Sequence, residues 1–224
     1  MKETSIMQTV TSEAAKPASK LLYIGGILGL PLVGMIAFAL QAVSAIESNP
    51  QPFLDLQDQI QTLAFGGSQI NPEMLESLFD PLIEQMKPGL ALMALSWLAV
   101  IGLFIKLVQA SWAALREAGD AEAPSPWGMA LLLLIPVFNF YWTFRAGLGW
   151  VRRYNQLLDA RGWSRPRFSE SLMQGACVTW ILTILPTVGV LFALVNSVLV
   201  FMLLGRVIDE INWLAEQSGA TQAA

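Results

Sequence analysis

The chain has 224 residues and a net charge of −4, and 54% of its residues are hydrophobic while only 13% are charged. Soluble domains average about 25% charged residues, so this composition excludes an ordinary soluble protein and predicts one that lies mainly in lipid. There is no histidine, and Cys177 is the single cysteine. A Ser-His-Asp triad, a histidine zinc site and an intrachain disulfide are therefore excluded. We expect no enzymatic activity, cofactor or metal, and no nucleic-acid partner.

Residues 1–20 form a polar leader that contains Lys16 and Lys20, and residues 21–46 form an apolar stretch long enough to cross a bilayer. The small residues of "AVSAIE" at 42–47 leave open a cleaved signal peptide. The apolar stretch exceeds the usual ~7–15 residues of such a signal, however, which favours a retained first transmembrane helix.

Residues 47–89 carry seven acidic residues against Lys87, which predicts a segment outside the cell. Apolar residues recur at helical spacing between Phe53 and Leu63 and again after Asn71-Pro72, where a cap and an N1 proline predict a helix start. The segment is therefore predicted to form two amphipathic helices separated by "FGGSQ". We interpret its acidic faces as solvated surfaces rather than as a metal site.

Residues 90–212 are predicted to form the main membrane domain, followed by a cytoplasmic tail at 213–224. A span at 90–115 contains Lys106, and residues 171–205 contain no charged residue at all. Thirty-five helical residues would measure about 50 Å, which exceeds the ~30 Å core of a bilayer. Pro186 and Gly189 therefore predict a helical hairpin over 168–208 with limbs 168–185 and 190–208, in which Asn196 makes an interhelical hydrogen bond.

Proline and glycine also interrupt the other apolar stretches. The predicted helix breaks and turns are Pro31, Gly34, Pro136, Pro186 and Gly189. Broken helices of this kind form substrate sites in transporters, but proline and glycine are also common in membrane helices generally.

The basic loop at 152–170 determines the predicted topology, because it holds five arginines against Asp159 and Glu170. Basic loops stay in the cytoplasm, and a full crossing by residues 127–151 would place this loop outside. We therefore predict that 127–158 is a re-entrant or interfacial hairpin: 127–135 enters, 136–139 turns and 140–158 returns as an amphipathic helix. The fold class is then all-α, with four transmembrane helices and both termini cytoplasmic. The alternative has five spans and an external C-terminus.

Special residues concentrate in the same stretch. Arg145 and Arg152 are seven residues apart and should share one helix face, from which they could bind one anionic group. The candidate site for an anionic lipid headgroup or a partner is Asn139, Tyr141, Trp142, Arg145, Arg152, Arg153 and Asn155. The alternative is that the basic residues only set topology and the aromatics only set depth.

Two functions follow as hypotheses: a non-catalytic scaffold or accessory subunit, and an oligomeric channel or facilitator that uses the proline-broken helices. The absence of charged lining residues favours the first. The motif "IPVFNFYW" at 135–142 and the later "LPTVGVL" resemble a loosely defined group of uncharacterised small bacterial multi-pass membrane proteins with an I-P-x-x-N-x-Y-W core, over about residues 90–212. The resemblance implies a multi-pass protein of a bacterial inner membrane, possessing no activity that can be carried over, and leaves a homo-oligomer or a membrane complex open.

Overall fold

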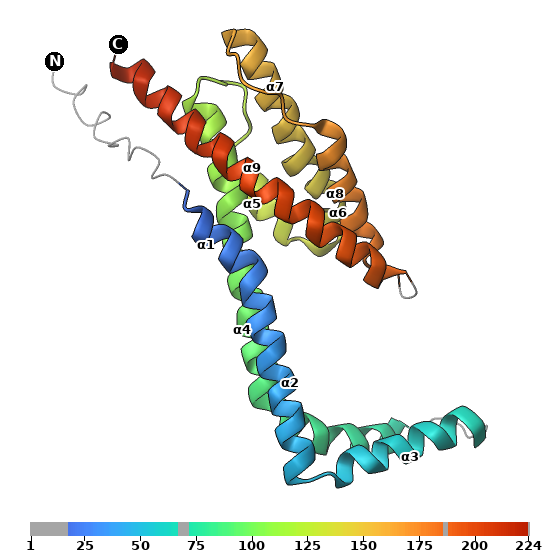
Figure 1. The fold of residues 1–224 in the computed structure, drawn as a ribbon. Coiled ribbons are helices and arrows are strands. Elements are labelled where there is room, and N and C mark those ends of the chain that lie inside the picture. The colour runs from blue at the N-terminus through green and yellow to red at the C-terminus, as the bar shows by residue number, and fades with distance from the viewer. Residues whose placement is uncertain (1–17, 67–71, 186–187, 224) are drawn as a thin grey trace, which may run out of the picture. The chain divides into compact units, whose positions relative to one another are not determined.

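The structure, a computed structural model, describes residues 18–66, 72–185 and 188–223. Every regular element among these residues is a helix (Figure 1), which confirms the all-α prediction. In chain order the elements are α1 (Lys20–Ile24), the π-helical turn η1 (Gly25–Gly29), α2 (Leu30–Ser48), α3 (Gln51–Gly66), α4 (Pro72–Glu117), α5 (Pro126–Leu131), the 3-10 turn η2 (Leu132–Leu134), α6 (Pro136–Thr143), the π-helical turn η3 (Phe144–Leu148), α7 (Gly149–Arg161), α8 (Glu170–Leu182) and α9 (Gly189–Ala223).

Three helical stretches in the described part of the chain are long and apolar enough to cross a membrane, namely Lys20–Ser48, Phe79–Glu117 and Leu191–Gly219. The expected count was four. The missing span is the first limb of the predicted hairpin, which forms α8 with only 13 residues. A helix of that length measures about 20 Å and cannot cross a ~30 Å core by itself.

The expected re-entrant hairpin at 127–158 also differs from the structure. The helix breaks at Ile135, whose backbone is extended (φ −84°, ψ 110°), and Pro136 is the first residue of α6 instead of part of a turn. A proline ring disfavours the helical conformation of the preceding residue and suits the first position of a helix. The entering limb is therefore only α5 and η2, whereas α6, η3 and α7 continue without a break to Arg161.

The chain divides into two compact units. The α7–α9 unit comprises the chain up to Gly25 together with Leu103–Ala224, and the α2–α4 unit comprises Gly26–Gly102. The core of the α7–α9 unit is fastened by two indole hydrogen bonds, from Trp112 to the carbonyl of Ala146 (3.2 Å) and from Trp150 to that of Ser111 (2.9 Å). Its largest fully buried side chains are Trp112, Trp150, Tyr154, Phe168, Leu115, Ile208, Leu214 and Val151.

In the α2–α4 unit, residues 47–89 were predicted to form two separate amphipathic helices. The first of these is present as α3. The second helix begins at Pro72, as expected, but it continues through Pro81 and Pro88 to Glu117 as α4. Figure 1 shows that α4 bends in its first half, as proline inside a helix requires.

The helices α2 and α4 lie side by side in this unit (Figure 1), and glycines mark their close approach. A Cβ atom on Gly34 would lie 2.8 Å from Ser96 Oγ, and one on Gly89 would lie 3.0 Å from Gln41 Cβ. The predicted break at Gly34 is therefore wrong: Gly34 lies inside α2, where it allows contact with α4. Pro31 stands in the first turn of α2, directly after the π-helical turn η1.

Replacing Gly89 with alanine is expected to lower the free energy of unfolding in mild detergent by about 1–2 kcal/mol, the usual cost of overpacking. The added methyl group would also lie 3.2 Å from the Cα atom of Phe38, and backbone yields less readily than side chains. Gly102→Ala in the same helix is the matched control, because no atom lies within 4 Å of its added methyl group. Equal stability of the two variants would contradict this account of the helix contact.

The charge-free run at 171–205 forms two helices that lie side by side (Figure 1), as predicted. The first ends at Leu182 and the second begins at Gly189, while the predicted turn residue Pro186 lies outside the described residues. The hydroxyl of Thr179 donates to Asn196 Oδ1 at 3.0 Å, which confirms the interhelical bond expected of Asn196. The second helix does not end near residue 208 but continues to Ala223, through the segment predicted as a tail.

Candidate functional site

Two arginines of the predicted anion site already have carboxylate partners. Arg152 Nε lies 3.0 Å from an oxygen of Glu170, and Arg153 Nη1 lies 3.1 Å from Asp120 and 3.5 Å from Glu122. The charge of each guanidinium is thus partly balanced by a carboxylate within the protein. Their anion binding stays a prediction, and it is less favoured than that of an unpaired arginine.

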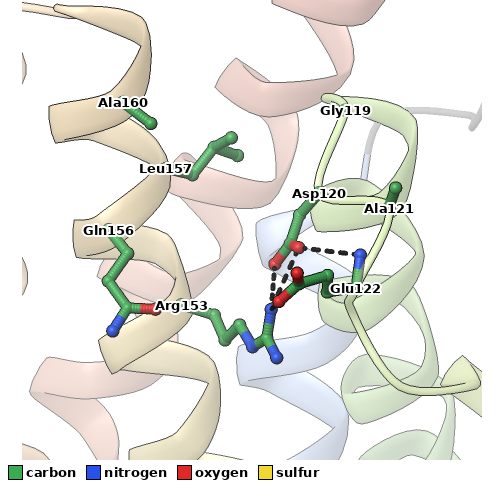
Figure 2. Close-up of a pocket in the computed structure, with 8 residues that line it drawn as sticks. All are labelled: Gly119, Asp120, Ala121, Glu122, Arg153, Gln156, Leu157 and Ala160. Atoms are coloured by element: carbon green, nitrogen blue, oxygen red, sulfur yellow. Dashed lines mark hydrogen bonds and ion pairs between the residues drawn. The ribbon is translucent and has the colours of Figure 1, made fainter.

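Arg153 lines a shallow pocket with a volume of about 260 Å³. Figure 2 shows that the guanidinium of Arg153 points at Asp120 and Glu122, and that Gln156 and Leu157 lie across the pocket from these carboxylates. Asp120 also accepts the backbone N–H of Glu122 at 3.2 Å. Two carboxylates therefore surround the one guanidinium that lines this pocket, which disfavours an added anion there.

The polar residues of the predicted cluster mostly hold the fold together. The amide oxygen of Asn139 accepts the hydroxyl of Thr143 within α6 (3.0 Å), and the indole of Trp142 donates to the carbonyl of Met129 (3.0 Å). The second bond ties α6 to α5 beside the break at Ile135. Trp142 therefore helps to position the turn between α5 and α6, whereas the Asn139 bond stays within α6.

Asn155 is a backbone clamp. Its side-chain amide donates to the carbonyl of Phe168 (3.0 Å) and its amide oxygen accepts the N–H of the same residue (2.8 Å). It thereby fixes the loop after α7, so that Phe168 stays buried against Trp150 and Tyr154.

Arg145 and Tyr141 are exposed, as Arg152 also is, but neither forms an ion pair or side-chain hydrogen bond in the described residues. Tyr141 is 57% exposed, and no acidic side chain in the described ranges forms an ion pair with Arg145. Arg145 lies in the π-helical turn η3, so the seven-residue spacing to Arg152 is not that of a regular α-helix. The structure thus gives Arg145 and Arg152 different surroundings instead of one shared site.

Sequence reasoning missed a buried polar network centred on Glu210, which is 5% exposed. Its carboxylate accepts the hydroxyl of Tyr154 at 2.6 Å and Arg165 Nε at 2.8 Å, and Arg206 Nε lies 3.9 Å away. Burial, and secondly the neighbouring Glu210, raise the pKa of Tyr154, so its hydroxyl remains a donor across the neutral range. The network joins α7, the following loop and α9.

Cationic and aromatic side chains surround this network. The guanidinium of Arg165 lies 5.0 Å from the ring centre of Trp213, and that of Arg206 lies 4.8 Å from Phe168. The sequence does carry a signal for the helix that holds Glu210. Apolar residues recur at helical spacing at Ile208, Ile211 and Leu214, which indicates that the helix continues past the charge-free run. All three are buried in the structure.

The helix α9 also contacts the start of the first span. Asn212 clamps the backbone of Ala18, accepting its N–H at 2.6 Å and donating to its carbonyl at 3.0 Å. Lys20 Nζ lies 2.7 Å from Asp209. Residues 18–20 and 209–212 are therefore at the same end of the α7–α9 unit.

The side chains of this region form ion pairs and hydrogen bonds with one another. Of the arginines predicted to bind an anion, Arg152 and Arg153 have carboxylate partners and Arg145 does not. The buried carboxylate of Glu210 accepts hydrogen bonds from Tyr154 and Arg165. Comparison of the chain with known protein families, with curated proteins and with solved structures finds no match. The resemblance to small bacterial membrane proteins therefore stays a prediction.

Proposed function

We propose that the protein is a non-catalytic integral membrane protein, a scaffold or accessory subunit, whose segment from α5 to η3 engages the headgroups of anionic phospholipids through Arg145. The observation that carries the proposal is the contrast between Arg145 and its neighbours. Arg152 and Arg153 are paired with carboxylates, whereas Arg145 has no ion-pair partner among the described residues and lies four positions after an exposed aromatic residue, Tyr141.

The turn between α5 and α6 has the composition of a membrane interface. Leu134, Ile135 and Phe138 are each about half exposed, at 51%, 46% and 49%. At the other end of α5, where Pro126 and Trp127 begin the helix, Lys106 Nζ lies 5.0 Å from the ring centre of Trp127. Aromatic rings and basic side chains are enriched at headgroup level, where the rings are half in lipid and the charges attract anionic headgroups.

We further propose that this surface faces the cytoplasm of a bacterial cell, with both ends of the described chain on that side of the inner membrane. The clamp of Asn212 on Ala18 supports a common side, because the start of the first span and the end of α9 are in contact. The arginine-rich loop supports the cytoplasmic side. The membrane-embedded part of α9 is then its first half, before Arg206.

Arg145→Gln is expected to reduce retention of an anionic phospholipid by about fivefold at low salt, which corresponds to the roughly 1 kcal/mol that one surface arginine contributes. Native mass spectrometry of the full chain released from phosphatidylglycerol-containing nanodiscs measures the retained lipid. The double variant Arg152→Gln with Glu170→Gln is the matched control and should change retention little, because it removes an ion pair whose net charge is zero. Equal lipid retention in wild type and Arg145→Gln would leave Arg145 only a role in topology.

A further inference from the structure

The hairpin of α8 and α9, which lies wholly within the α7–α9 unit, is charged at its base and uncharged toward its tip. Glu170 begins α8 and Arg206 lies in α9, while residues 171–205 between them contain no charged residue. Arg206 donates to two backbone carbonyls of the loop that leads into α8, at 3.1 and 2.7 Å. Both limbs therefore leave the same polar end of the unit. The tip (residues 183–185 and 188–191) is at the other end (Figure 1).

The charge-free limbs are too short to reach across a bilayer. At 1.5 Å per residue, α8 measures about 20 Å, and the part of α9 from Gly189 to Gly205 measures about 25 Å. The hydrocarbon core is about 30 Å thick. The rest of α9 adds length, but it holds Arg206, Asp209 and Glu210, whose polar contacts with α1 and with the loop before α8 belong outside the core. The tip therefore stops short of the far headgroups.

A further charge places the near surface of the bilayer closer still to the tip. Arg145 lies in η3, and a neighbour in the same turn, Gly147, faces the middle of α8. A Cβ atom added to Gly147 would lie 3.1 Å from Met173 Sδ and 3.7 Å from Cys177 Sγ. A guanidinium is costly inside the core, so the level of η3 belongs near the headgroups. From Cys177 to Leu185 the hairpin then extends only about 12 Å, less than half of the core.

The described residues of the tip suit a hydrocarbon environment. Ile184, Leu185 and Leu191 are 60%, 45% and 66% exposed. The backbone N–H groups of Ile184, Leu185 and Gly189 donate to carbonyls of the same turn at 3.2, 3.2 and 2.7 Å. The hydroxyl of Thr183 donates to a backbone carbonyl of α8 at 2.6 Å. Lipid supplies no hydrogen-bond partners, so a turn whose donors are satisfied internally is the kind that lipid accepts.

We propose that the α8–α9 hairpin is a one-sided wedge, which enters the bilayer from the side on which Arg206 lies and ends among the acyl chains of the interior. Its ligand is the acyl chains of phospholipids, which cover the tip and are displaced mainly from one leaflet. The wedge goes beyond the headgroup contact proposed for Arg145. It stands without that contact, because it needs only the charge of the arginine and the lengths of the limbs.

The test measures the depth of single bimane labels on the full chain in phosphatidylcholine nanodiscs, in a Cys177→Ser background. Labels at Ile184→Cys and Leu191→Cys report on the tip, and a label at the exposed Ser164→Cys reports on the near surface. A nitroxide near the end of the acyl chain quenches labels deep in the core, whereas a headgroup nitroxide quenches labels at either surface. The acyl nitroxide is expected to quench the tip labels at least about twofold more than the headgroup nitroxide, because the middle of the core is about 15 Å from both surfaces.

Ser48→Cys, exposed at the end of α2, is the matched control for a helix that crosses the bilayer. Its label should be quenched mainly by the headgroup nitroxide, as should the label at Ser164→Cys. A membrane-impermeant maleimide provides a second measurement, because it reaches both faces of a nanodisc. It should modify Ser48→Cys and Ser164→Cys and leave Ile184→Cys unmodified. Leu185→Cys, also exposed, replaces either tip variant if that variant folds poorly.

The wedge is overturned if the headgroup nitroxide quenches the tip labels more than the acyl nitroxide does, or if maleimide modifies the tip as fast as Ser48→Cys. Either result would show a hairpin that reaches the far surface. A tip quenched by neither nitroxide would show that protein, such as a second copy of the chain, covers it, and would overturn lipid as its ligand. Unchanged lipid retention in Arg145→Gln would leave the wedge standing, so the two proposals fail separately.

Discussion

Glu210→Ala is expected to lower the free energy of unfolding in mild detergent by about 3 kcal/mol, within the range found when one partner of a buried charged pair is removed. The substitution leaves the hydroxyl of Tyr154 fully buried without its acceptor, 2.6 Å away in the native protein. An unsatisfied buried polar group costs about 1–3 kcal/mol. Arg165 is 34% exposed at its side chain and contributes less, because water can replace part of the lost interaction.

The matched control is Glu216→Ala, which removes an exposed carboxylate from the same helix. It should change stability by no more than about 0.5 kcal/mol, as surface substitutions usually do. Tyr154→Phe should cost about 1 kcal/mol, since it removes the donor but leaves Arg165 on the carboxylate. In the Glu210→Ala background, Tyr154→Phe should lower the free energy of unfolding by less than it does in the wild type, because the two side chains share one hydrogen bond. Strict additivity would contradict the network.

Gly189→Ala is expected to destabilise the hairpin of α8 and α9 by roughly 2–3 kcal/mol, which is the upper part of the range for overpacking. An added Cβ would lie 2.3 Å from the carbonyl oxygen of Thr183 and 3.1 Å from its carbon. These are backbone atoms, so the chain between the helices must shift. The N–H of Gly189 also donates to the carbonyl of Leu185 at 2.7 Å, a bond that this shift would weaken.

Gly175→Ala in α8 provides the comparison, because its added methyl group would lie 4.0 Å from the nearest side-chain atom, on Leu199. That variant should be neutral or more stable by up to about 1 kcal/mol, the helix preference for alanine. Chemical unfolding followed by tryptophan fluorescence measures both variants. Equal effects at the two glycines would show that the approach of Gly189 to Thr183 does not limit the turn.

Local signals in the sequence predicted part of this fold well. Pro186 and Gly189 revealed the interruption in the charge-free run, and the Asn196 amide, expensive in lipid, found its partner in Thr179. Pro72 marked a helix start that the structure has. Each of these effects acts over a few residues or between two adjacent helices.

Pairings between distant residues could not be predicted in the same way. Arg153 and Asp120 are 33 positions apart, and Tyr154 and Glu210 are 56 apart, so no local pattern joins them. Without those partners the arginines resembled an open anion site. The π-helical turn η3 also has no sequence signal, and it invalidated the regular spacing assumed between Arg145 and Arg152.

The clamp between Asn212 and Ala18 joins residues 194 positions apart, nearly the two ends of the described chain. Ribosomes add about 5–20 residues per second, so the leader emerges roughly 10–40 s before its partner is made. During that interval the first span must remain inserted without its anchor on α9. The contact between α9 and the start of the first span therefore forms only after the last helix is made. A chain whose synthesis stops before residue 212 cannot form it.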